Sequence, residues 1–152
     1  MSELVRGSSV PLFDRLSSHE SPGNAGAFLL APDQLEASLA RELSRLFNTR
    51  CRLMPSQYKE STGTVIDYGI PDFSAMSPRR GEDRELLEAA LAHAVGFFEP
   101  RMSKVVVKVS AIPERGDAAT ATVSGDVMIG LKPQRMSFSL NLNPSPTGAN
   151  QT

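Results

Sequence analysis

The stretch Glu99-Pro100-Arg101 places an acid, a rigid turn and a base side by side. The apolar spacing upstream predicts that a helix ends at this point, where the helix dipole disfavours the negative charge of Glu99 by roughly 0.3–1 kcal/mol. Pro100 cannot continue the helix and biases Glu99 away from helical geometry. Arg101 is able to offset the charge of Glu99 or to bind a carboxylate of a partner. Two interpretations stay open, a docking device and an internal ion pair.

The other side chains with reactive groups are scattered. His19 and His93 are far apart and Cys51 is the single cysteine, so the sequence lacks the ligand spacing of a metal site. It also lacks the GxSxG, Walker A and GxGxxG motifs. Three acidic residues could supply the carboxylates of a glycoside hydrolase, namely Asp67, Asp72 and Glu99. Their spacing does not place any two across a cleft, and we expect no catalytic residue, metal or cofactor.

The composition is that of a globular protein. Of its 152 residues, 40% are hydrophobic and 22% are charged. A formal net charge of −1 argues against a nucleic-acid binder, which would carry a basic excess. No apolar run approaches the ~20 residues that span a bilayer, and the first residues lack the apolar segment of a signal peptide. A single cysteine excludes an intrachain disulfide and fits a reducing cytoplasm.

The sequence divides into an arm (residues 1–27), one domain (28–143) and a tail (144–152). Ser, Pro and Gly punctuate the arm and leave little apolar surface to offset the entropy of ordering, so we expect it to be flexible, and the tail to be disordered. One apolar island interrupts the arm at residues 11–16, where Leu12, Phe13 and Leu16 are the large apolar side chains. The island is either a docking segment for a partner or a single turn that folds back on the domain.

Two helices are predicted within the domain. The first runs from Pro32 to Asn48, with Leu35, Leu39, Leu43, Leu46 and Phe47 on one stripe. Burial of such a stripe contributes on the order of 10 kcal/mol before entropy. The second runs from about Glu82 to Phe98 and carries a broad apolar stripe.

Three strands should follow the second helix. They cover residues 104–112, 119–131 and 136–142, with a hairpin at 114–117, a bulge at Gly125 and a turn at 132–134. The expected fold is therefore α+β, with two main helices packed on an antiparallel sheet of three or more strands. The third strand has a polar face with Ser137 and Ser139 and no charge or proline between residues 136 and 142. An unguarded edge of this kind can pair with a strand of another chain.

The segment from Thr64 to Phe73 is predicted to be irregular, because Gly69 and Pro71 interrupt its apolar residues. Tyr68 is its candidate functional residue. The alternative is that Tyr68, Ile70 and Phe73 fill the gap between the helices.

Several motifs in one order resemble the short wedge proteins of contractile-tail baseplates, and most closely the TssE family of the type VI secretion system. They are residues 12–16 (LFDRL), 46–50 (LFNTR), 67–73 (DYGIPDF) and 98–102 (FEPRM), the last followed by a valine-rich strand. The resemblance covers roughly residues 11–142. Phe13 and Met102 stand where the family usually has Leu.

The resemblance implies a structural protein without catalysis, located in the cytoplasm at the inner-membrane-associated baseplate. Its implied partners are the wedge proteins TssF and TssG, the contractile sheath subunits and other baseplate components, with no nucleic acid and no direct insertion in the membrane. It also implies that Glu99, Pro100 and Arg101 form the wedge-docking element. Two alternatives remain, a lysozyme-like peptidoglycan hydrolase and the tail wedge of a phage-derived particle.

Overall fold

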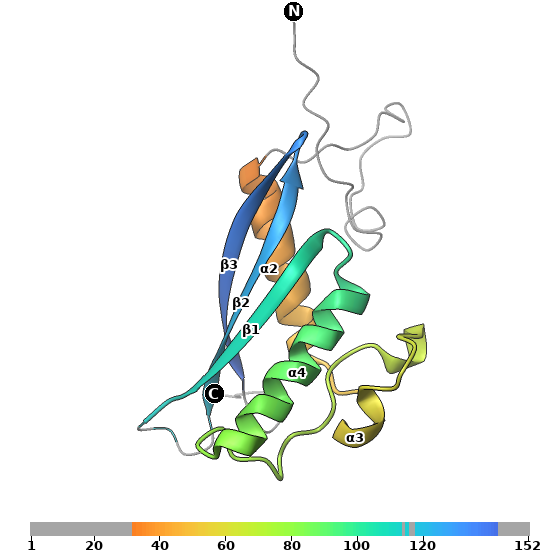
Figure 1. The fold of residues 1–152 in the computed structure, drawn as a ribbon, viewed down its shortest axis with the longest axis vertical. Coiled ribbons are helices and arrows are strands. Elements are labelled where there is room, and N and C mark those ends of the chain that lie inside the picture. Colours follow the sequence, from red (N-terminus) through yellow and green to blue (C-terminus); the bar gives the residue numbers. More distant parts are fainter. Residues whose placement is uncertain (1–31, 114, 116–117, 143–152) are drawn as a thin grey trace, which may run out of the picture.

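The structure, a computed structural model, describes residues 32–113, 115 and 118–142 (Figure 1). In chain order these residues form α2 (Pro32–Asn48), α3 (Pro55–Tyr58), the 3-10 helix η1 (Val65–Asp67), α4 (Gly81–Phe98), β1 (Met102–Ala111), β2 (Ala119–Ile129) and β3 (Lys132–Leu142). The predicted arm and tail lie outside the described residues, and so do the predicted contact residues Leu12, Phe13 and Leu16.

The predicted α+β fold is confirmed. The three strands form an antiparallel sheet in the order β1-β2-β3. α2 lies behind the sheet and α4 runs beside β1 (Figure 1). The described helices leave the opposite face of the sheet uncovered, and residues that point to this face alternate with buried ones along β2 and β3.

The helices begin and end close to their predicted positions. α2 has the predicted bounds, and the five apolar residues of its predicted stripe are all buried. α4 begins at Gly81, one residue before the predicted start, and buries Leu87, Ala90, Leu91, Ala94 and Val95. The short helix α3 was not predicted, and its Tyr58 is buried in the core.

The turn predicted at residues 132–134 is wrong. These residues belong to β3, and the β2–β3 turn consists of Gly130 and Leu131 between the paired residues Ile129 and Lys132. Gly130 has a φ of 64°, a backbone conformation that glycine adopts at little cost in a two-residue hairpin. Pro133 is tolerated inside β3 because β3 is an edge strand.

The bulge predicted at Gly125 lies instead on the neighbouring strand. The register between β1 and β2 shifts between Ser103 and Val106, whereas β2 pairs with β3 without interruption through Gly125. A Cβ atom at Gly125 would lie 2.8 Å from Met102 Cε. Gly125 therefore provides the space that the irregular start of β1 occupies.

Candidate docking site

The seam between α4 and β1 is built as the sequence predicted. α4 ends at Phe98, and the Glu99 N–H donates to the Val95 carbonyl oxygen at 2.9 Å. The Met102 N–H then donates to the Glu99 carbonyl oxygen at 3.1 Å, and β1 begins. Helix and strand are thus joined through Pro100 by a hydrogen-bonded turn rather than by a linker.

Glu99 and Arg101 form a bidentate ion pair across this turn. Arg101 Nε donates to Glu99 Oε1 and Arg101 Nη2 donates to Glu99 Oε2, each at 2.6 Å. The Arg101 backbone N–H also points at Oε1, at 3.3 Å. Glu99 is only 3% exposed. The guanidinium thereby offsets the charge that the end of α4 disfavours.

A third residue ties this pair to the other helix. Arg101 Nη1 donates to Ser38 Oγ at 3.1 Å, and Ser38 of α2 is fully buried. The structure therefore has the internal pair that the sequence left open. The Glu99 carboxylate faces the protein, and Pro100 is the exposed residue of the motif. Docking of a partner at these residues stays a prediction.

A groove of about 760 Å³ lies beside the seam. We call it the α2–η1 groove, and its lining includes Glu42 and Arg45 of α2 and Thr49 just after it, together with Val65, Tyr68 and Phe98. Ser38, Glu42 and Arg45 follow one another at helical spacing on α2, and Thr49 comes next after its end, so the groove continues the face that holds Arg101.

Tyr68 forms one wall of the α2–η1 groove. Its ring packs edge-on against Phe98, with centroids 5.2 Å apart and an interplanar angle of 71°. Partial burial raises the pKa of the Tyr68 phenol, and the negative charge of Glu42 raises it further. Tyr68 is half-buried, whereas Ile70 and Phe73 are buried as the gap-filling interpretation predicted.

Hydrogen bonds hold the segment around Tyr68 against the end of α2. The Ile70 N–H donates to the Thr49 carbonyl and the Cys51 N–H donates to the Ile70 carbonyl, both at 2.9 Å. The buried Tyr58 hydroxyl donates to the Gly69 carbonyl at 2.6 Å. These bonds fix the position of Tyr68 relative to α2.

The two edges of the sheet are guarded differently. On β1, the Val109 N–H donates to Glu88 Oε1 of α4 at 2.9 Å, so it points away from β2. N–H groups of an antiparallel strand alternate between its two sides. Val109 pairs with Ala121, so the Ala121 N–H points away from β1 and toward β3. Ala121 pairs with Leu140, whose N–H therefore points toward β2. By alternation, the N–H groups of Ser137 and Ser139 point outward, away from β2.

Two further observations agree with this alternation. By the same alternation, the backbone nitrogen of Pro133, which carries no hydrogen, points outward, where no bond within the sheet is lost. Ile129 and Lys132 flank the two-residue turn, and the alternation makes them a hydrogen-bonded pair, as such hairpins require. Ser137 and Ser139 are both exposed. Within the described ranges, no side chain bonds to their backbone N–H groups.

The comparison with protein families decides which kind of protein carries this arrangement. Residues 33–134 match the family model described as baseplate wedge protein gp25. The chain belongs to this family. The sequence-based resemblance to short baseplate wedge proteins, which include the TssE type, is thereby confirmed, and the chain is a structural baseplate component.

A solved structure has the same fold as this wedge protein. A chain in the structure titled "The baseplate complex from the type VI secretion system" aligns with a TM-score of 0.52 and is 18% identical in sequence. The alignment covers 73% of this wedge protein and 96% of that chain. No curated protein matches the sequence significantly.

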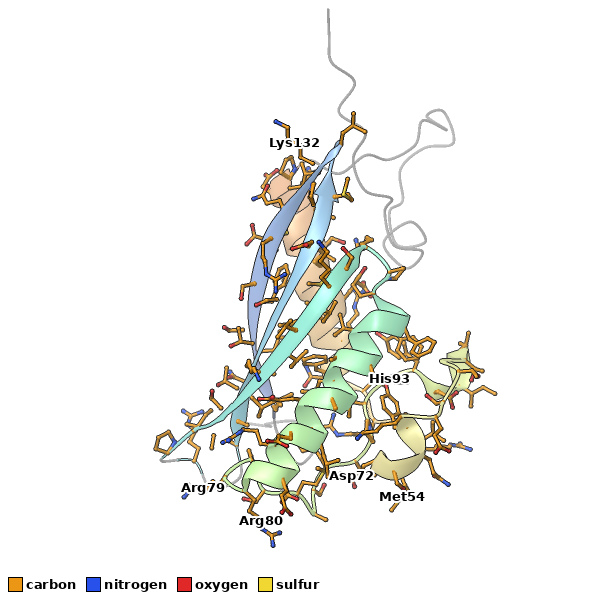
Figure 2. The ribbon with its side chains drawn as sticks, in the orientation of Figure 1. Met54, Asp72, Arg79, Arg80, His93 and Lys132 are labelled. Carbon is orange, nitrogen blue, oxygen red and sulfur yellow. The ribbon has the colours of Figure 1, made fainter. Side chains whose placement is uncertain are left out.

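The carboxylates considered for a hydrolase each have a local structural partner in the wedge protein. Glu99 is paired with Arg101, and Asp67 Oδ2 accepts from the Thr64 hydroxyl at 2.7 Å. Asp72 lies on the side of the molecule that carries α3 and accepts from the Ser74 N–H at 2.9 Å (Figure 2). The hydrogen bonds from Ser74 lower the pKa of Asp72. Among the described residues no three His, Cys, Asp or Glu side chains form a metal-binding group.

Sequence reasoning missed two residues of the site. Ser38 could have been found, because it is a small polar residue on the buried stripe between Leu35 and Leu39. Glu88 carries no such signal, since nothing in the sequence relates it to the edge of β1.

Proposed function

We propose that this wedge protein is the TssE-type subunit of a type VI secretion baseplate, where it docks to other wedge subunits and templates the contractile sheath by strand addition. The family match and the fold shared with a chain of such a baseplate support the machine. The outward N–H groups of Ser137 and Ser139 carry the templating role. The family is structural, and we infer that the protein has no enzymatic activity.

Strand addition needs a free edge, and the less guarded outward N–H groups of β3 favour this strand over β1. On β1 the Glu88 carboxylate already occupies the outward N–H of Val109, and Lys108 Nζ lies 3.2 Å from Glu88 Oε2. On β3 the corresponding donors are exposed and alternate with the short side chains of Ser137 and Ser139. A guest strand of a sheath subunit would gain backbone hydrogen bonds there, and its alternate side chains would provide selectivity.

Docking to the wedge subunits, TssF and TssG in the type VI system, uses the seam between α4 and β1. Glu99, Arg101 and Ser38 hold the shape of this seam, which presents the exposed Pro100 and the remaining surface of Arg101. Tyr68 extends the same surface through its contact with Phe98. In this proposal Glu99 and Arg101 position the docking surface more than they contact the partner.

The proposed location is the cytoplasmic face of the inner membrane, where such a baseplate sits. None of the helices that the structure describes is long and apolar enough to cross a bilayer.

The test is a proline scan of β3, read out by recruitment of sheath subunits to purified baseplate complexes. Ser139→Pro removes an outward donor, so it should abolish recruitment while the protein stays folded and still binds TssF and TssG. Ser139→Ala removes the same side chain but keeps the backbone donor, and it is the matched control. Normal recruitment by a folded Ser139→Pro variant would refute strand addition at β3. Co-purification with phage tail proteins instead would refute the assignment to a secretion system.

A further inference from the structure

The 3-10 helix η1 exposes an unusual amount of apolar surface. Val65 is 91% exposed and Ile66 is 81% exposed, although both are large aliphatic residues on adjacent positions. Phe97, at the end of α4, is 44% exposed. Val65 also lines the α2–η1 groove with Tyr68 and Phe98. Contiguous apolar surface of this kind marks an interaction site.

We propose that the α2–η1 groove binds residues 11–16 of the same chain, with Leu12, Phe13 and Leu16 as the apolar anchors. The proposal concerns the isolated protein. Its test therefore does not depend on whether the protein acts in a baseplate.

The length of chain between the island and α2 fits this groove. From Pro32 to Arg45 the helix axis rises about 20 Å. Residues 17–31 connect Leu16 to Pro32, and a coil of about 16 links has an r.m.s. span of roughly 22 Å. Effective concentration is highest when the span of the connecting segment matches the distance to be bridged, and it reaches the millimolar range. Even a weak site at the groove would be occupied under these conditions.

The chemistry of the island also fits the groove. Leu12, Phe13 and Leu16 have the i, i+1, i+4 spacing that would fall within one apolar face about 100° wide if the island formed a helical turn. The side chains that they would meet on the η1 side of the groove are Val65, Tyr68 and Phe98, which are apolar or aromatic. The polar residues of the island, Asp14 and Arg15, are one acid and one base.

The rim of the groove carries the complementary charges. Glu42 and Arg45 lie side by side there, with Arg45 Nη1 2.5 Å from Glu42 Oε1. Because Glu42 and Arg45 pair with each other, a bound island would extend this pair into a four-charge network, with Asp14 near Arg45 and Arg15 near Glu42. A bound island would lie next to the face of α2 that holds Arg101, and it would widen the surface available to a wedge subunit.

Paramagnetic relaxation in the full chain tests the proposal. Cys51→Ser with Ser17→Cys allows one nitroxide label directly after the island. We expect the methyl signals of Val65 and Ile66 to lose most of their intensity. Replacing Leu12, Phe13 and Leu16 by serine should restore that intensity. Leu4→Ser with Val5→Ser, which removes arm residues outside the island, should leave the loss unchanged.

Each other outcome would overturn the proposal. Equal loss of intensity with the serine-substituted island would mean that the label reaches the groove only because it is tethered nearby. No loss would mean that the island binds elsewhere or only to a partner. Mixing labelled chains with isotope-enriched unlabelled chains distinguishes a second copy as the occupant, since broadening would then pass between molecules. Amide signals of residues 32–142 that lie away from the groove and from position 51 should be unchanged in every variant, which shows that the domain stays folded.

Discussion

Glu88 of α4 accepts the outward backbone N–H of Val109 in β1, at 2.9 Å. A helix side chain thereby occupies a position where a neighbouring strand would otherwise bond. The opposite edge of the sheet, formed by β3, has no such side chain among the described residues. This asymmetry makes β3 the less guarded edge of the sheet, and we therefore expect a guest strand to pair there rather than at β1.

Removal of this guard should have two measurable effects. In Glu88→Ala the Val109 N–H loses a charged acceptor, which should lower the free energy of unfolding by about 1.5–3 kcal/mol. The open β1 edge should also cause self-association at high concentration, detectable by light scattering. Glu85→Ala, an exposed residue of the same helix, is the control. Equal stability and equal self-association of the two variants would show that Glu88 does not protect the β1 edge.

Arg101→Ala should destabilise the protein strongly. It leaves the buried Glu99 carboxylate without its partner, and the loss of one member of a buried pair costs about 3–5 kcal/mol. Ser38→Ala removes only the bond to Arg101 Nη1 and should cost about 1 kcal/mol. Chemical denaturation of the three proteins measures both values. A docking role without internal pairing would instead leave the stability of Arg101→Ala unchanged.

Partner binding can be separated from this loss of stability by exchanging the charges. In Glu99→Arg with Arg101→Glu an internal pair can re-form, so we expect part of the stability to return. Contacts with a wedge subunit would then meet reversed charges, and binding should be lost. Retained binding in a stable exchanged protein would mean that the pair serves only the fold.

The parts of the fold that local signals determine were predictable from the sequence. The apolar stripe and Pro32 gave both ends of α2, and the helix-ending chemistry of Glu99 and Pro100 gave the seam. The β2–β3 turn was misplaced because Pro133 was read as a turn residue. Only its place on an edge strand makes it acceptable within β3.

The contacts that complete the site were not predictable, because they join residues distant in sequence. Ser38 meets Arg101 across 63 positions, and Glu88 meets Val109 across 21. The choice between docking and internal pairing at Glu99 depended on the first of these contacts and on burial. No local pattern contains that information.

The core residue Tyr58 and the groove residue Tyr68 should respond differently to loss of their hydroxyl groups. Tyr58→Phe leaves the buried Gly69 carbonyl without its donor and should cost about 1 kcal/mol at neutral pH.

For Tyr68, the pKa of the phenol is raised in the folded protein, so its stabilising contribution is full below the unfolded pKa, about 10. It is lost as the pH rises from there through the folded pKa. Tyr68→Phe should therefore reduce the decline in stability above pH 10. A denaturation series from pH 8 to 11 measures it, and an unchanged slope would contradict the assignment.

The last prediction compares two glycines that differ in their surroundings. Gly69 has a φ of 117°, and a Cβ atom there would lie 2.6 Å from the Thr49 carbonyl oxygen. That oxygen accepts the Ile70 N–H, so Gly69→Ala should both strain the backbone and push the segment around Tyr68 away from α2, at a cost of at least 1–3 kcal/mol. Gly96 lies in α4, where an added Cβ meets nothing within 4 Å. Gly96→Ala should instead stabilise the protein by about 0.5–1 kcal/mol. Thermal unfolding measures whether each variant is more or less stable than the parent protein. A Gly69→Ala protein as stable as the parent would show that the close approach to Thr49 is not required.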